Sequence, residues 1–142
     1  MAWYVDTSAF FKLVQNEVHA DAFRAWAEAD PSPMLVSSEL LITEALRGAR
    51  RAALAAVALA RIKLTTIHLC SLDAADLARA ADLDPAILRS LDALHLTAAL
   101  TFGEDLEGIV TYDDRLADAA RLHGVRVESP GRQPLVATGP EA

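Results

Sequence analysis

The chain has 142 residues, of which 53% are hydrophobic and 23% charged, and its 20 acidic against 13 basic side chains give a formal charge of −7. That length suits one domain with its own core, and the composition is too apolar for a disordered chain. The single cysteine, Cys70, excludes a disulfide framework and a multi-cysteine zinc site and is typical of a reducing cytosol. The excess of acid, taken alone, argues against a nucleic-acid partner, because lysine and arginine carry phosphate binding.

No targeting or membrane-spanning segment is visible in the sequence. Residues 1–6 carry neither a basic stretch nor a long apolar run. The longest uncharged runs, 52–60 and 93–103, reach about half of the roughly 20 residues that a transmembrane helix needs, and both have helical spacing. We therefore expect a cytoplasmic protein that does not contact a membrane.

Apolar periodicity and capping residues divide the chain into alternating strands and helices. In chain order they predict strand 2–5, helix 7–14, helix 18–29, strand 34–36, helix 38–48, helix 50–63, strand 64–69, helix 74–83, helix 91–102, strand 108–112, helix 116–122 and strand 125–127. These elements form one domain over residues 1–130, followed by a flexible tail over 131–142.

Polar and small residues are expected to set the helix ends. Thr7 and Ser8 are capping types at the start of the first helix, and Ser37 and Ser38 stand in the same relation to the third. Gly48 is expected to end that third helix.

Strands that alternate with helices predict a three-layer α/β/α domain, in which helices cover both faces of a mainly parallel sheet of about five strands. In such sheets, ligands bind outside the carboxyl ends of the strands. Asp6 directly follows the first strand, and Asp113 and Asp114 directly follow the fourth. Two separate strands therefore deliver carboxylates to the same edge of the sheet.

Two more acids lie inside helices among apolar neighbours. Glu44 is flanked by leucine, isoleucine and alanine, and Asp92 by leucine and alanine. A carboxylate in such a setting is unfavourable unless it is paired or binds a cation. We therefore expect Asp6, Glu44, Asp92 and Asp113 to converge on one pocket.

Four carboxylates in one pocket repel one another. At a separation of roughly 5 Å and an effective dielectric constant near 20, each pair repels by about 3 kcal/mol. Raised pKa values or a divalent cation relieve this repulsion. Ligation by oxygen alone favours Mg²⁺ or Mn²⁺ over zinc, and Mg²⁺ held by carboxylates is the usual partner of phosphate chemistry.

Four short motifs carry these acids. They are Val5-Asp6-Thr7-Ser8, residues 37–44 with Arg47, residues 88–96 and residues 110–116. In this order and spacing they resemble the motifs of PIN-domain ribonucleases, and more narrowly those of VapC-type toxins of toxin–antitoxin pairs. The resemblance extends from Tyr4 to about Pro130 and implies a PIN-like nuclease domain.

The resemblance implies endonucleolytic cleavage of RNA that depends on Mg²⁺ or Mn²⁺, with Asp6, Glu44, Asp92 and Asp113 as catalytic and metal-binding acids. Asp6, Asp92 and Asp113 would bind one or two ions, and Glu44 would complete the site through water or accept a proton from the attacking water. It also implies 5′-phosphate and 3′-hydroxyl ends, a homodimer and a VapB-type antitoxin. The family acid of the fourth motif directly follows Thr-x, which favours Asp113 over Asp114.

Neighbouring side chains are candidates for supporting roles. Thr7, Ser8 and Thr111 would bond to the carboxylates or to a metal water, and Asp114 would assist at the fourth motif. Capping of a helix is the alternative for each of them and for Asp6.

Two arginines are candidates for contacts with RNA phosphates. Arg47 lies on the Glu44 side of its helix, and Arg115 follows the fourth motif. The alternative for Arg47 is an ordinary solvated position, and the alternative for Glu44 is an ion pair with Arg47, three residues on. For His95, three residues after Asp92, a buried and hydrogen-bonded side chain is favoured, and contact with the site is the alternative.

Two other functions compete with the nuclease. A phosphatase with Asp6 as its nucleophile would need a second aspartate two positions on, where this chain has Ser8. A non-catalytic, protein-binding module of PIN-like fold would not need the complete set of acids. The apolar faces of helices 38–48 and 50–63 would serve a dimer or an antitoxin.

The charge of −7 does not exclude RNA once the acids are placed. Four of them are assigned to the metal site, and Glu104, Asp105 and Glu107 are expected in a loop at the opposite edge of the sheet.

Overall fold

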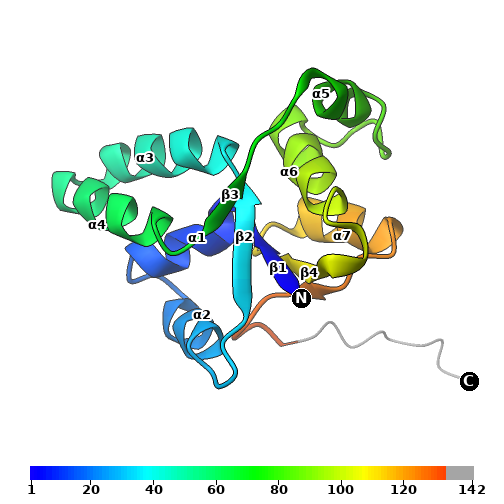
Figure 1. Ribbon diagram of the computed structural model, residues 1–142. Helices are drawn as coiled ribbons and strands as arrows, with labels where there is room; N and C mark the ends of the chain where they lie inside the picture. The colour runs from blue at the N-terminus through cyan, green and yellow to red at the C-terminus, as the bar shows by residue number, and fades with distance from the viewer. Residues whose placement is uncertain (134–142) are drawn as a thin grey trace, which may run out of the picture.

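The computed structural model describes residues 1–133, which form a domain around a sheet of five parallel strands. In sheet order the strands are β3 (His68–Cys70), β2 (Met34–Ser38), β1 (Ala2–Val5), β4 (Leu106–Val110) and β5 (Val127–Glu128) (Figure 1). The predicted α/β fold with a parallel sheet of about five strands is confirmed. Of the predicted tail, 131–142, all but residues 131–133 lie outside the described part of the chain.

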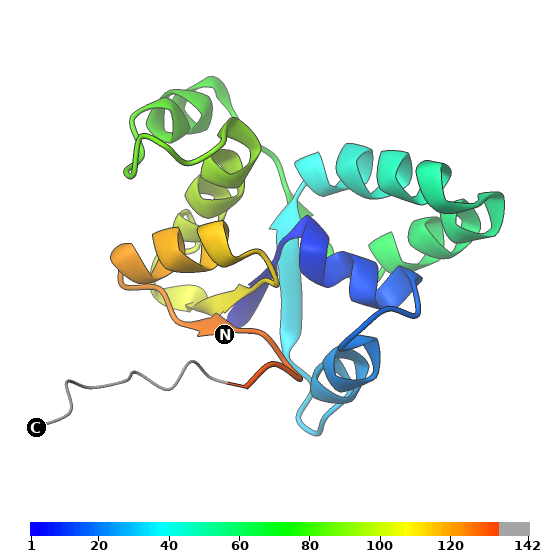
Figure 2. The ribbon, with the colours of Figure 1, turned by 180° about the vertical axis from the view of Figure 1, so that it is seen from behind.

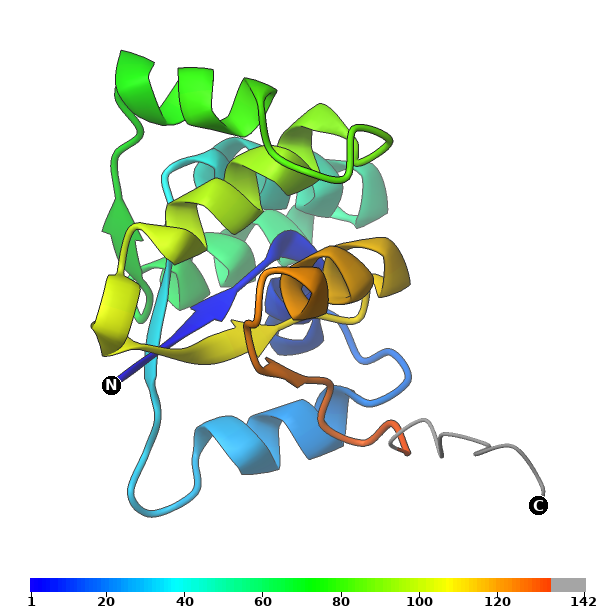
Figure 3. The ribbon, with the colours of Figure 1, turned by 90° about the vertical axis from the view of Figure 1, so that its right-hand side faces the viewer.

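Helices cover both faces of the sheet. They are α1 (Thr7–Val14), α2 (Ala20–Ala27), α3 (Leu40–Ala52), α4 (Leu54–Leu64), α5 (Ala74–Ala81), α6 (Ser90–Leu100), the 3₁₀ helix η1 (Gly103–Asp105) and α7 (Asp114–Leu122). Helices α1 to α4 lie on one side and α5 to α7 on the other (Figures 1 and 2), and a view onto the second side shows α5, α6 and α7 in front of α3 and α4 (Figure 3). Across residues 1–133, none of the helices has both the length and the apolar character that crossing a membrane requires.

Alternate side chains of β1 pack into two separate hydrophobic cores, one on each face of the sheet. Trp3 and Val5 pack with α1 to α4, where the Trp3 ring meets Trp26 edge-on with 5.3 Å between centroids. Ala2 and Tyr4 face the other side and pack with α6 and α7. Because successive strand side chains point to opposite faces, a strand covered by helices on both sides is apolar throughout.

The order of the strands reverses beside β1. The chain passes from β1 to β2 and β3 on one side and then crosses to β4 on the other. Val5 pairs in register with Val110, so the carboxyl ends of β1 and β4 lie side by side. Open α/β sheets bind their ligands at such reversals, outside the strand ends. Asp6 and residues 111–113 occupy this position.

Two local predictions about the third helix are wrong because tertiary contacts override local signals. Ser37 and Ser38 are fully buried in β2 instead of capping a helix, and Ser37 Oγ donates to a β1 carbonyl at 2.7 Å. Helix α3 runs through Gly48, and the break falls at Ala53, whose backbone is extended. The glycine makes room for Phe11, since a Cβ on Gly48 would come within 2.8 Å of Cε2 of that ring and closer still to Cζ.

Several element ends also differ from the prediction. Strand β4 ends at Val110 instead of residue 112, so Asp113 lies three residues beyond the strand and does not follow it directly. Strand β3 is shorter than the predicted strand 64–69, because helix α4 extends to Leu64. The hydroxyls of Thr65 and Thr66 donate to the last carbonyls of α4 at 2.6 and 2.7 Å. The cap of α1 is Asp6, whose side chain accepts the backbone N–H of Ala9, rather than either of the two residues that follow it.

Candidate active site

Asp6 lies buried at the carboxyl end of β1, where its carboxylate accepts hydrogen bonds from two segments of the chain. It accepts the Ser8 hydroxyl at 2.8 and 2.9 Å on its two oxygens, the Thr111 hydroxyl at 2.6 Å and the Ala9 backbone N–H at 2.9 Å. Capping of α1 and a place in the site are therefore compatible roles for Asp6. Burial nevertheless raises the pKa of Asp6, because these hydrogen bonds offset only part of the lost hydration.

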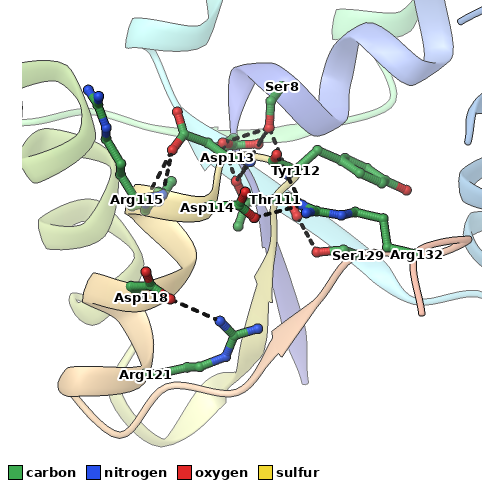
Figure 4. Close-up of polar contacts among 12 residues, drawn as sticks. Ser8, Thr111, Tyr112, Asp113, Asp114, Arg115, Asp118, Arg121, Ser129 and Arg132 are labelled. Atoms are coloured by element: carbon green, nitrogen blue, oxygen red, sulfur yellow. Dashed lines mark hydrogen bonds and ion pairs between the residues drawn. The ribbon is translucent and has the colours of Figure 1, made fainter. Parts of the chain in front are cut away.

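The segment that follows β4 is fixed against α1. The Tyr112 backbone N–H donates to Ser8 Oγ at 2.9 Å, and the Asp113 backbone N–H donates to Thr111 Oγ1 at 3.0 Å. Figure 4 shows these side chains together where the strand ends meet the start of α1. Ser8 and Thr111 each donate to Asp6 and accept an amide of this segment, so the positions of Asp6 and Asp113 are coupled.

The adjacent acids Asp113 and Asp114 make different contacts. Asp113 caps α7, with its Oδ1 accepting the backbone N–H groups of Arg115 at 2.9 Å and Leu116 at 3.2 Å. The Asp114 side chain is 74% exposed and pairs with Arg132 at 2.9 Å (Figure 4). Asp114 is therefore engaged at the surface, and Asp113 lies at the strand edge.

Glu44 and Asp92 reach the same edge from α3 and α6. Oε1 of Glu44 lies 2.6 Å from Nε2 of His95. Asp92 lies in the first turn of α6, and its pKa is raised first by burial, then by the negative charges of Asp113 and Asp6, and less by Glu44, with His95 acting in the opposite direction. Asp92 thus lies within electrostatic range of the other three predicted acids.

The donor chemistry of this edge fits a hard divalent cation. Carboxylate oxygens are the ligands of Mg²⁺ and Mn²⁺. Burial raises the pKa of both Asp6 and Asp92, and for Asp92 the neighbouring carboxylates raise it further. Within residues 1–133, no three Asp, Glu, His or Cys side chains are gathered closely enough to enclose an ion. Asp6 is held by hydroxyls, Asp113 by α7 amides and Glu44 by His95, so these carboxylates are engaged by donors of the protein itself.

His95 contacts a site acid, which is the alternative that the sequence made second to a purely structural role. The ring is buried and hydrogen-bonded, as predicted, but one of its partners is Glu44. Its spacing of three residues from Asp92 was the available signal, because such residues share one side of a helix. Thr7 Oγ1 lies 3.4 Å from the same ring nitrogen, so Thr7 contacts the histidine rather than an acid.

The two candidate phosphate contacts are exposed arginines. Arg47 lies on α3, one turn after Glu44, and Arg115 lies in the first turn of α7. Glu44 bonds to His95 instead of to Arg47, so the alternative of a Glu44–Arg47 ion pair is not realised.

A model of the PIN domain matches residues 3–122, from β1 to the end of α7. The chain belongs to the PIN-domain family. Its relatives in this family include Ribonuclease VapC46 of Mycobacterium tuberculosis, 37% identical over 129 residues that cover 91% of this chain and 98% of that protein. Ribonuclease VapC35 of the same species is 34% identical over 131 residues, with 91% and 97% covered. The resemblance of the four motifs to VapC-type PIN domains is confirmed.

The fold of this PIN domain is also similar to a solved structure, the crystal structure of VapBC2 from Rickettsia felis bound to a DNA fragment from their promoter. The TM-score is 0.70 at 15% sequence identity, and the match covers 90% of this chain and 98% of that chain. At this identity, the similarity supports the fold alone.

Proposed function

We propose that this VapC-type chain is an endoribonuclease that depends on Mg²⁺ or Mn²⁺ and acts as the toxin of a VapBC-type pair. The observation that supports the proposal is that Asp6 and Asp113 follow the adjacent ends of β1 and β4, with the carboxyl of Asp92 sensing the charges of Asp113, Asp6 and Glu44. The similarity to proteins named Ribonuclease VapC46 and Ribonuclease VapC35 supports RNA as the substrate.

Each acid has a distinct part in this chemistry. Asp6, Asp92 and Asp113 would hold the ion, which when bound supplies positive charge at the attacked phosphate and lowers the pKa of water. Glu44 is the proton acceptor, because His95 occupies one of its oxygens and leaves the other for a proton of the attacking water. The water oxygen bonds to phosphorus as the P–O3′ bond breaks, and the leaving oxygen takes up a proton. The products carry 5′-phosphate and 3′-hydroxyl ends.

Ser8 and Thr111 support this arrangement by holding Asp6. Both hydroxyls donate to its carboxylate, and both are themselves fixed by backbone amides of the segment after β4. The Asp6 carboxylate therefore keeps one orientation, which reduces the reorganisation that substrate binding requires.

The net charge of −7 is compatible with an RNA partner, because part of the excess acid lies far from this edge. Glu104 and Asp105 lie in η1 and Glu107 lies near the start of β4, at the opposite end of that strand. Arg47 and Arg115 are the proposed phosphate contacts beside the acids.

Protein partners are part of the same proposal. Apolar side chains on α4 face solvent in this chain, with Leu54 86% and Ile62 61% exposed, which supports a surface covered by a VapB-type antitoxin or by a second copy in a homodimer. The homodimer, the antitoxin and the cytoplasmic location stay predictions. Light scattering of the purified chain checks the first of them.

A phosphatase with Asp6 as its nucleophile has less support. Both oxygens of Asp6 accept hydrogen bonds, and the residue is 4% exposed. A phosphorus atom could not approach either oxygen without breaking this network.

Cleavage of RNA by the purified chain tests the proposal. Wild-type protein should cleave in Mg²⁺ or Mn²⁺ and stop in chelator, and Asp6→Asn should not cleave. Asp118→Asn, at an exposed position on α7, is the matched control and should cleave like wild type. Cleavage in chelator, or equal cleavage by Asp6→Asn, would contradict the proposal. An absence of cleavage under every condition would favour the non-catalytic binding module.

A further inference from the structure

A buried chain of hydrogen bonds joins β1, α6 and α3 beside the edge of the sheet where β1 and β4 end. Tyr4 Oη lies 2.7 Å from Nδ1 of His95, and Nε2 of the same ring lies 2.6 Å from Oε1 of Glu44. Tyr4 is fully buried and His95 is 2% exposed, whereas the Glu44 side chain is 23% exposed. The chain of bonds therefore runs from the core to the surface of the site.

The chemistry of the three groups fixes the direction of these bonds. A carboxylate only accepts hydrogen bonds, so Nε2 carries the hydrogen that faces Glu44. In a neutral imidazole, Nδ1 is then the acceptor, and the Tyr4 hydroxyl donates to it. Burial raises the pKa of Tyr4, which keeps this hydroxyl protonated. A charged imidazole would donate from both nitrogens, and its Nε2–H would still face Glu44.

Packing alone does not explain why this side chain is a histidine. The ring uses both of its nitrogens, and the outer one binds Glu44, whose own helix carries Arg47 three residues on. Without the Nε2–H group, a partly exposed Glu44 could turn to Arg47 or to solvent. The histidine therefore selects one of several orientations open to Glu44.

We propose that His95 is a positioning residue that holds Glu44 at the edge where β1 and β4 end, and that Tyr4 supports the ring by donating to Nδ1 of the tautomer that Glu44 selects. The proposal rests on the proposed nuclease function, in which Glu44 accepts a proton. The histidine itself contacts neither RNA nor water in this scheme. Removal of groups that orient site ligands changes activity or metal affinity by about 10–100-fold.

Two substitutions of His95 separate the bond to Glu44 from the bond to Tyr4. The amide nitrogen of glutamine reaches the position of Nε2, whereas that of asparagine reaches only the position of Nδ1. We expect His95→Asn to lower kcat for RNA by about 10–100-fold with little change in KM, and His95→Gln to recover most of the loss. Equal losses in both variants, or wild-type kcat in His95→Asn, would overturn the proposal. Wild-type protein that does not cleave RNA would overturn the nuclease function instead.

Imidazole ¹⁵N NMR gives a readout that needs neither RNA nor metal, and it does not require His95 variants to fold. In its neutral form, the wild-type His95 ring should carry its hydrogen on Nε2 and none on Nδ1. Tyr4→Phe should keep the hydrogen on Nε2, because Glu44 still requires it, but should shift the Nδ1 resonance, because that nitrogen has lost its donor. Circular dichroism confirms that the variant is folded. A hydrogen on Nδ1 in the neutral wild-type ring, or an unchanged Nδ1 resonance in Tyr4→Phe, would overturn the role assigned to Tyr4.

Discussion

Replacing Asp6 by alanine removes the acceptor of three donors at once. These are the Ala9 backbone N–H and the hydroxyls of Ser8 and Thr111. Loss of a helix N-cap costs about 1 kcal/mol, and each hydroxyl that loses its acceptor costs about 1 kcal/mol more. Relief of the buried charge reduces this sum. We expect Asp6→Ala to lower the free energy of unfolding by about 2–3 kcal/mol.

Asparagine at the same position separates the charge from the hydrogen bonds. It keeps one oxygen to accept the Ala9 N–H, and it removes the negative charge whose burial raises the Asp6 pKa. Its amide group can donate to a hydroxyl that turns to accept. Asp6→Asn should therefore unfold within about 1 kcal/mol of wild type, although it loses the proposed nuclease activity.

Urea unfolding gives the free energies and thermal unfolding gives Tm, both followed by circular dichroism at pH 7 in chelator. The alanine variant should lose roughly 10 °C in Tm, and the asparagine variant less than half as much. Asp118→Asn, 78% exposed on α7, controls for the loss of one surface charge. Equal losses in the two Asp6 variants, or an alanine variant as stable as wild type, would refute the reasoning that these hydrogen bonds stabilise the fold.

Three further predictions concern packing, pH and metal. Gly48→Ala should lower the free energy of unfolding by about 1–3 kcal/mol in urea titrations, because the new methyl group overlaps the Phe11 ring; a more stable variant would show that the helix is not crowded there. Asp92→Asn should raise Tm at pH 7 in chelator, and the gain should vanish as the pH falls towards the ordinary aspartate pKa of 3.8. The sign follows because the folded state holds this proton to higher pH than the unfolded chain, so stability falls as the pH rises through that window; a gain independent of pH would speak against it. Millimolar Mg²⁺ or Mn²⁺ should raise the Tm of wild type more than that of Asp6→Asn, and equal shifts would argue against a bound ion at Asp6.

The sheet and the positions of its acids along the chain could be predicted, because the residues that indicate them are adjacent in the sequence. Asp6 stands directly after a buried apolar run, and the position of the first strand therefore gives the position of the acid. Glu44 and Asp92 stand out because each carboxylate lies among apolar neighbours in a helix. In such cases a few adjacent residues contain the whole physical reason for the placement.

Features that depend on contacts between distant segments could not be predicted in the same way. Ser37 is a residue type that often caps helices, yet here it is buried in β2 and its hydroxyl donates to a carbonyl of the neighbouring strand. Glycine often ends a helix, yet α3 continues through Gly48, where the absence of a side chain makes room for the Phe11 ring of α1. The bond from His95 to Tyr4 spans 91 residues of sequence, and no local pattern carries it.

The central claim is that this PIN domain cleaves RNA with its carboxylates and a divalent ion. The most direct measurement is sequencing of RNA 5′ ends after expression of the wild-type chain beside Asp6→Asn, with ligation that requires a 5′-phosphate, done with and without a kinase that phosphorylates 5′-hydroxyl ends. We predict new 5′-phosphate ends at defined positions in the wild type and none in the variant. The same ends in both samples, or new ends that carry a 5′-hydroxyl, would contradict the claim.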